Sequence, residues 1–123
     1  MRYQDLLAYQ KGFSLAMKIF ELSKSFPKDE KYSLTDKIRR SSRSVCVNIA
    51  EAYRKRDYPR HFHSKLTDRD AENSETLTWL EFALACNYIK SEIFESFSKE
   101  NEEVGKLINY MMQNPQKFGV KQI

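Results

Sequence analysis

The chain has 123 residues, of which 41% are hydrophobic and 13% aromatic, and its formal net charge is +4 at pH 7; this composition suits one folded domain and excludes a disordered chain. Only 3 Gly and 3 Pro occur, too few for the many tight turns of a sandwich or barrel. No apolar run approaches the ~20 residues that span a bilayer, and the first residues lack the apolar stretch of a signal peptide, so we expect a cytoplasmic protein with no membrane partner.

Four long helices are predicted along the chain. Their approximate bounds are 4–25, 30–54, 58–87 and 91–114. The first ends before Phe26-Pro27, because the residue that precedes a proline is disfavoured in a helix. The second opens near the Ser33-x-x-Asp36 capping box, and the third has Pro59 in its first turn. Short connections between long helices predict an all-α, antiparallel up-down four-helix bundle, with residues 1–123 as its single domain.

The first and third helices carry apolar residues on two sides. In the first helix, one side carries Leu6, Phe13, Met17 and Phe20, and the opposite side carries Leu15, Ile19, Leu22 and Phe26. In the third, Trp79, Phe82 and Cys86 lie away from the main stripe of Phe62, Leu66, Leu77, Leu80 and Leu84. A bundle has an interior on one side of each helix only, so the second side predicts self-association. The alternative is an irregular core that wraps around these helices.

Polar residues inside the apolar stretches raise two further expectations. Asp70 and Asn73 interrupt the stripe of the third helix, so they need hydrogen-bond partners if they are buried. Cys46 and Cys86 lie in apolar helical stretches, where we expect both to act as small buried hydrophobes.

The residue types that carry catalysis are not in a productive arrangement. Neither His61 nor His63 has an acid three residues earlier, and their spacing directs the two rings to different sides of a helix. Glu72-x-x-Glu75 has no histidine companion. There is no Gly-rich phosphate loop, nucleophile elbow or Cys-x-x-Cys pair. We therefore expect no catalytic residue, no metal site and no cofactor.

Positive charge is concentrated in the second and third helices. Residues 31–70 carry 11 basic and 5 acidic side chains. One cluster is Arg39, Arg40 and Arg43; the second is Arg54, Lys55, Arg56 and Arg60, extended by His61, Lys65 and Arg69. Arginine suits bidentate contacts with phosphate, so these clusters predict a surface for a nucleic-acid backbone. The alternative is a solvated helix face with local ion pairs, such as Asp36 with Arg40.

Several of these residues form a recognisable pattern. Phe26-Pro27, Ile38-Arg39-Arg40-Ser41 and Asn48-Ile49-Ala50-Glu51 resemble the bacterial four-helix bundle family, which includes proteins encoded in intervening sequences of the large-subunit ribosomal RNA gene, some of them labelled ribosomal-protein-like. Ala71 to Glu81, with Trp79, is similar to one branch of that family. The chain departs from the family at Ala52, where many members have glycine, and at Ser41, where alanine is typical.

The resemblance implies a homopentamer of four-helix bundles, often with a central channel. A relative, the accessory variability determinant of diversity-generating retroelements, works with a reverse transcriptase and binds nucleic acid through basic surfaces. By that similarity Arg39, Arg40 and Arg43 lead the contact residues. For most members no activity is established.

Three residues of the pattern are interpreted as structural. The amide of Asn48 is placed to cap or cross-link helices, and Glu51 is placed to pair with Lys55 one turn later. Trp79 belongs to the motif of the third helix. The sequence thus predicts a non-enzymatic oligomer that contacts RNA or DNA backbone, and the alternative is a scaffold or adaptor for a protein partner.

Overall fold

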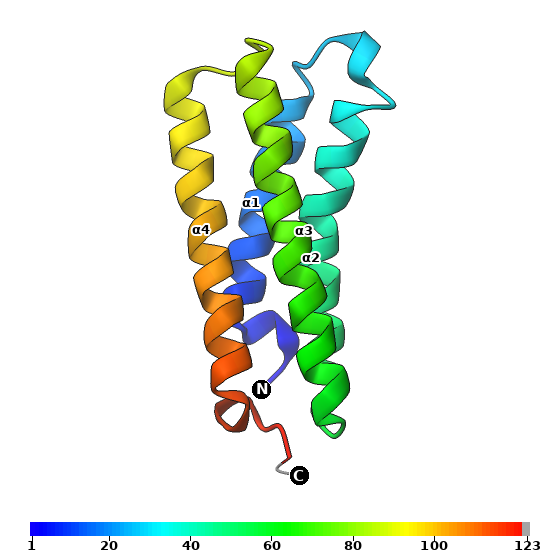
Figure 1. The fold of residues 1–123 in the computed structure, drawn as a ribbon, viewed down its shortest axis with the longest axis vertical. Helices are drawn as coiled ribbons and strands as arrows, with labels where there is room; N and C mark the ends of the chain where they lie inside the picture. Colours follow the sequence, from blue (N-terminus) through cyan, green and yellow to red (C-terminus); the bar gives the residue numbers. More distant parts are fainter. Residues whose placement is uncertain (122–123) are drawn as a thin grey trace.

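Four long helices alternate in direction in the computed structural model, which describes residues 1–121 (Figure 1). The helices are α1 (Leu7–Ser23), α2 (Leu34–Arg54), α3 (Pro59–Ala85) and α4 (Ser91–Gln113). Short 3-10 turns are η1 (Tyr3–Asp5), η2 (Lys28–Glu30) and η3 (Pro115–Phe118). No strand occurs in residues 1–121. The predicted all-α up-down bundle is confirmed, and the last two residues of the predicted domain lie outside the described range.

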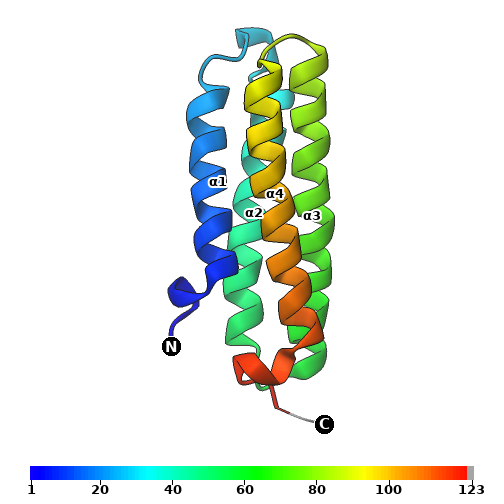
Figure 2. The ribbon, with the colours of Figure 1, turned by 90° about the vertical axis from the view of Figure 1, so that its left-hand side faces the viewer.

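Each helix packs chiefly against its two neighbours in chain order, and α4 closes the bundle by packing on α1. Two views at right angles show the four helices side by side along one long axis (Figures 1 and 2). The connection between α2 and α3 and both ends of the described chain lie at the lower end of the bundle, and the other two connections lie at the upper end. The long α1–α2 connection contains η2.

Two predicted helix starts are wrong by several residues. The first helix does not run from residue 4, because the extended backbone at Leu6 separates η1 from α1 while its side chain enters the core. The second begins at Leu34 rather than at residue 30. There the carboxylate of Glu30 accepts hydrogen bonds from the Ser33 hydroxyl and the Leu34 N–H, whereas Ser33 makes no capping bond to the helix. The first turn is therefore capped from outside α2.

The end of α3 is a Schellman motif. Asn87 adopts a left-handed conformation with φ of 62°, which asparagine tolerates better than most residues. The Tyr88 N–H then donates to the Ala83 carbonyl at 2.9 Å, and the Asn87 N–H donates to the Leu84 carbonyl at 3.0 Å. These bonds satisfy carbonyls that the helix end leaves free and turn the chain toward α4.

A polar layer divides the core into two apolar clusters. The lower cluster centres on Ile49, Phe62 and Ile108, and the upper one on Ile19, Ile38 and Leu80.

Between them, Asn73 of α3 and Asn101 of α4 each donate a hydrogen bond from the side-chain amide to the other's main-chain carbonyl, both at 3.0 Å. Thr76 donates to Ser41 of α2 at 2.8 Å. The expectation that Asn73 finds a partner is confirmed. Asp70 is exposed and stays outside the core, so it needs no buried partner.

The second apolar sides of α1 and α3 remain partly at the surface. Phe13 and Met17 are 51% and 47% exposed, and Phe82 is 54% exposed. The core therefore does not wrap around these helices. Cys46 is buried as predicted, but Cys86, the residue that follows α3, is exposed, so its predicted burial is wrong.

Candidate nucleic-acid interface

Two arginines of the first cluster lie on the α1 side of α2. Arg39 and Arg43 place their guanidinium carbons 4.7 and 5.4 Å from the ring centre of Phe20. Arg39 also donates from Nε to the hydroxyl of Ser23 at 2.7 Å. Stacking on an aromatic ring orients a guanidinium and leaves donors free for an anion. Helix α1 thus fixes these two cations.

Arg40 does not join them, because consecutive helix positions differ by ~100° in direction. It lies 3.8 Å from Asp36 on its own helix, the local ion pair that the sequence offered as an alternative. It also lines a polar cleft between α2 and α3, with a volume of about 280 Å³, together with Lys37, Ser41, Ser44, Glu72 and Glu75. The predicted arginine trio is therefore split between two faces of α2.

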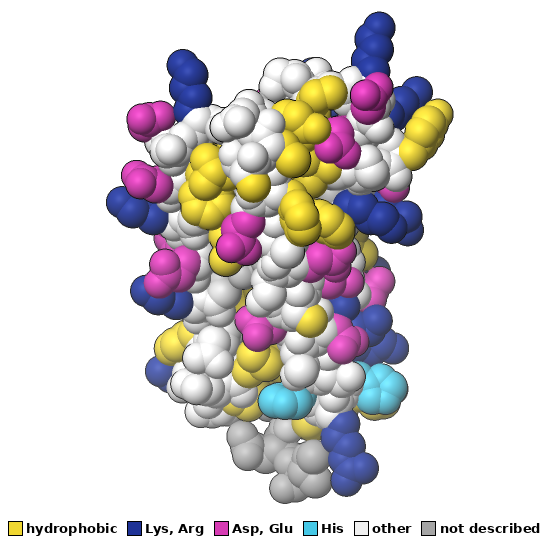
Figure 3. Space-filling model, turned by 45° about the horizontal axis from the view of Figure 1, so that its top comes forward, with side chains coloured by type: hydrophobic (Ala, Val, Ile, Leu, Met, Phe, Trp, Pro, Cys, Tyr) yellow, Lys and Arg dark blue, Asp and Glu magenta, His cyan; other side chains and the backbone are white. Residues whose placement is uncertain are grey.

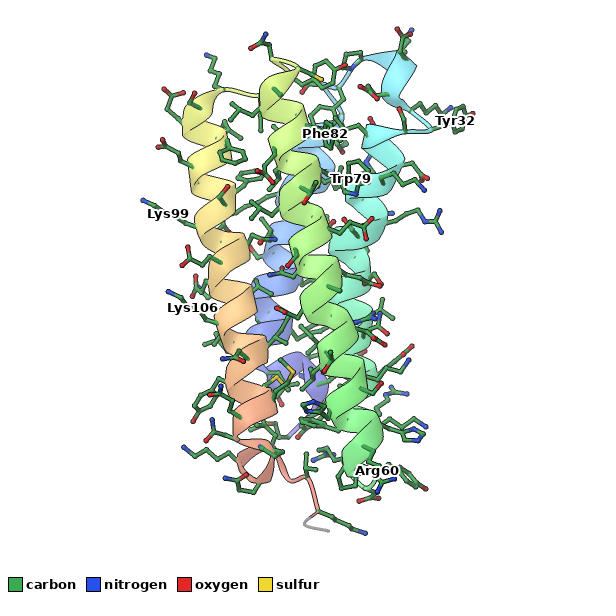
Figure 4. All side chains as sticks on the ribbon, in the orientation of Figure 1. Tyr32, Arg60, Trp79, Phe82, Lys99 and Lys106 are labelled. Atoms are coloured by element: carbon green, nitrogen blue, oxygen red, sulfur yellow. The ribbon has the colours of Figure 1, made fainter. Side chains whose placement is uncertain are left out.

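The second basic cluster is split as well. Arg54 is exposed and its guanidinium lies 5.6 Å from the ring centre of Tyr3, so it faces the same side as Arg43. Lys55 lies 5.7 Å from the ring of Tyr58 at the α2–α3 turn. Arg60 lies at the lower end of α3 (Figure 4) and is exposed.

Three other predicted basic residues serve the fold. Arg56 donates from Nε to the Tyr53 carbonyl at 2.8 Å and packs on the ring of that residue at 3.8 Å. Lys65 forms an ion pair with Glu51 at 2.9 Å. Arg69 is buried between α2 and α3, where it contacts Glu72 at 3.2 Å. A solvated place for Arg69 in the cluster is therefore wrong.

Two predicted structural contacts are corrected. Glu51 pairs across the bundle with Lys65 of α3, and no ion pair with Lys55 is formed within the described chain. Asn48 donates from Nδ2 to the carbonyl of Ser44 at 2.8 Å and to its hydroxyl at 3.0 Å, so its amide bonds within α2 and does not cross-link helices. Trp79 is partly buried and donates from Nε1 to Glu75 at 3.1 Å.

Between α1 and α2 lies an open apolar cleft with a volume of about 480 Å³. It is lined by Tyr3, Tyr9, Phe13, Ala16, Met17, Arg43, Cys46, Val47, Ala50, Glu51 and Arg54. Arginines thus border an aromatic wall. Sequence reasoning placed Phe13, Met17 and Phe20 on one side of the first helix, but it did not connect this side with the arginines. The apolar side of α1 and the arginines of α2 are each visible in the sequence. Only the packing of the two helices shows that they share one cleft.

The described residues contain no group of three metal-ligating side chains close enough to hold an ion. His61 and His63 are both exposed. No helix in residues 1–121 is long and apolar enough to cross a membrane.

Comparisons with known proteins place this arrangement in a family. Residues 4–110 match the family described as 23S rRNA-intervening sequence protein. A solved structure, a protein of unknown function from the S23 ribosomal protein family of Bacteroides thetaiotaomicron VPI-5482, superposes with a TM-score of 0.80. The two are 29% identical over 89% of this chain and 98% of the other. No curated protein matches the chain. With its fold and most of its length matched, the chain belongs to the family of 23S rRNA-intervening sequence proteins.

Proposed function

We propose that this chain is a non-enzymatic, oligomeric protein that binds the backbone of RNA or DNA. The contact surface is the arginine row, defined as Arg39, Arg43 and Arg54 on the α1 side of α2. The observation that carries this proposal is that none of the three forms an ion pair with a carboxylate of residues 1–121. Phe20 of α1 holds Arg39 and Arg43, and Tyr3 of η1 lies against Arg54. Two other predicted cations, Arg40 and Lys65, already have acidic partners.

The chemistry of the row fits phosphate better than bases. A guanidinium offers paired donors that match two oxygens of one phosphate. Nothing in the row forms a protruding helix or strand that could enter a groove and read base pairs, so binding in a duplex would be directed to the backbone. The description of the family, 23S rRNA-intervening sequence protein, makes RNA the first nucleic acid to test.

The test is a fluorescence-anisotropy titration of the oligomer with labelled single-stranded RNA and duplex DNA at several salt concentrations. We expect log affinity to fall linearly with log salt concentration, because each phosphate contact releases counterions. Replacing Arg39, Arg43 and Arg54 by alanine should lower affinity at least tenfold and reduce the magnitude of the salt slope by about two. Salt-insensitive binding, or an unchanged affinity in this variant, would contradict the proposal.

A matched control removes the same charge from another face. Lys90, Lys99 and Lys106 are exposed, and Lys99 and Lys106 point away from the bundle on α4 (Figure 4). Their replacement by alanine should change affinity much less than replacement of the arginine row. Absence of binding at low salt from an intact oligomer would favour the alternative function, a scaffold for a protein partner.

Self-association is the second part of the proposal. The rings of Phe82 and Trp79 are in tilted contact, with centres 5.8 Å apart and planes at 37°, and Phe82 is 54% exposed. Hydrophobic side chains gather toward the top of the molecule, with acidic side chains among them (Figure 3). Trp79 and Phe82 belong to α3, whereas the arginine row lies on the α1 side of α2. We assign Trp79 and Phe82 to contacts between subunits, in the homopentamer that the family resemblance implies.

A further inference from the structure

The α1–α2 cleft has the walls of a stacking site. Tyr3 and Tyr9 meet edge to face with centres 5.1 Å apart, and Tyr9 and Phe13 stack with centres 6.0 Å apart and planes at 30°. The cleft volume of about 480 Å³ lies within the range of small-ligand sites, ~300–1,000 Å³. Phe13 is 51% exposed, so its ring is accessible to a ligand. A flat aromatic group fits these surfaces.

Cations stand at two points of the same cleft. Arg43 and Arg54 both line it, and they are eleven positions apart in α2, which is about 16 Å along the helix axis. Successive phosphates rise ~3.4 Å in a stacked strand and more where a base is unstacked. The two arginines therefore match phosphates several nucleotides apart, with the intervening nucleotides over the aromatic wall.

We propose that this cleft takes an unstacked base of a single-stranded nucleic acid, while Arg43 and Arg54 hold phosphates on either side of it. This inference rests on the proposed function and narrows its ligand class. Charge complementarity identifies the occupant: the cleft combines aromatic faces with cations, the pairing of features that single-strand binding grooves use. The bases of a duplex are paired and stacked inside the helix, so they do not reach the cleft.

The carboxylate among the lining residues does not oppose this arrangement. Glu51 is neutralised by Lys65 of α3 at 2.9 Å, so the arginines keep their charge for the ligand. The cleft also lies beside the pair Arg39 and Phe20, which continues the cation and aromatic alternation along α1 and α2.

The test compares Phe13→Ser with the matched control Leu7→Ser, in a residue that lies on the same helix, is also 51% exposed and does not line the cleft. The ligands are a short single-stranded RNA that carries a fluorescent adenine analogue, a DNA strand of the same sequence, and the corresponding duplex. We expect Phe13→Ser to weaken single-strand binding on the order of tenfold, the effect of losing one stacked base, and to leave duplex binding unchanged. Leu7→Ser should leave binding of every ligand unchanged.

The adenine analogue supplies a readout of stacking itself. Its fluorescence should change on binding to the native protein and stay near the free value with Phe13→Ser at saturation. Whichever single strand, RNA or DNA, binds with the higher affinity is the nucleic acid that the cleft prefers. Equal affinity of single strands and duplex, with no effect of Phe13→Ser, would overturn the base-binding inference and leave the arginine row in place.

Two other outcomes separate the possible failures. No binding of any of the three ligands at low salt would overturn the proposed function and this inference together. Dissociation of the oligomer by Phe13→Ser but not by Leu7→Ser, measured by light scattering, would show that a second copy of the chain occupies the cleft and would overturn the inference alone.

Discussion

The buried amide pair at the centre of the bundle requires α3 and α4 to approach each other closely. Asn73 and Asn101 satisfy each other, and a side chain added at Gly105 would lie 3.1 Å from the Asn73 amide nitrogen. The glycine therefore lets α4 carry its own partner residue close to α3. A buried amide without that partner keeps its desolvation cost and gains no hydrogen bond in return.

Replacement of one member should be costly for that reason. We expect Asn73→Ala to lower the free energy of unfolding by about 2 kcal/mol, because the Asn101 amide is left buried and unpaired. Urea denaturation measures the loss. Asn109→Ala, at an exposed position of α4, serves as the control and should change stability by less than about 0.5 kcal/mol. Equal small losses in the two variants would contradict the assigned role of the pair.

The two cysteines should differ in reactivity. Burial raises the pKa of the Cys46 thiol to about 11, so very little reactive thiolate exists at neutral pH, whereas Cys86 is exposed. A thiol reagent at neutral pH should therefore modify one cysteine rapidly in the native protein and two after denaturation. In Cys86→Ser the rapid phase should vanish. Its persistence in that variant would show that Cys46 is accessible.

At the scale of the elements, the helices could be predicted from sequence but several of their ends could not. Periodic apolar residues and the scarcity of glycine and proline were sufficient to place all four. The start of α2 depends on Glu30, whose carboxylate is bound by Ser33, by the Leu34 N–H and by Tyr88 at 2.8 Å. Tyr88 follows α3, so this contact exists only once the helices have assembled.

This contact makes a prediction for acid stability. Hydrogen bonds from Ser33 and Tyr88 hold the pKa of Glu30 below its usual value of 4.5. Ionised Glu30 thus stabilises the fold above pH 4.5, and that contribution is lost as pH falls through the lower pKa of the folded state. Tyr88→Phe should therefore weaken the dependence of the urea midpoint on pH in this acidic range. The control Tyr32→Phe, in the same linker as Glu30, should retain the full dependence.

The sequence predicts which residues belong to the candidate interface, but it does not predict which way their side chains face. The sequence identifies the basic residues of α2 and the second apolar side of α1. It does not tell which basic residues face solvent, because that depends on the neighbouring helix. Phe20 orients Arg39 and Arg43, whereas Asp36 and the α3 side receive Arg40. Arg69 is the clearest example of what the sequence does not predict. A charged residue in a basic run is expected to face solvent, but Arg69 lies buried beside Ser44 and Glu72.

At the scale of the whole molecule, the exposed apolar surface of α3 should govern assembly. We expect Phe82→Ser to lower the molar mass measured by light scattering, because it places a polar group in a contact that excludes water. Tyr32→Ser, at an 82% exposed position in the α1–α2 linker, is the control and should leave the mass unchanged. An unchanged mass of Phe82→Ser would move the subunit contact away from this part of α3.

The polar layer also restricts how the helices can slide. Apolar side chains exchange places at little cost when one helix shifts by a turn, but a displaced Asn73 would face leucine or isoleucine without a partner. The layer therefore fixes the register of α3 against α4, at some expense in stability. The double replacement Asn73→Leu with Asn101→Leu should give a free energy of unfolding equal to or above that of the native protein. Its side-chain NMR resonances should broaden, because the bundle then samples more than one alignment of α3 and α4.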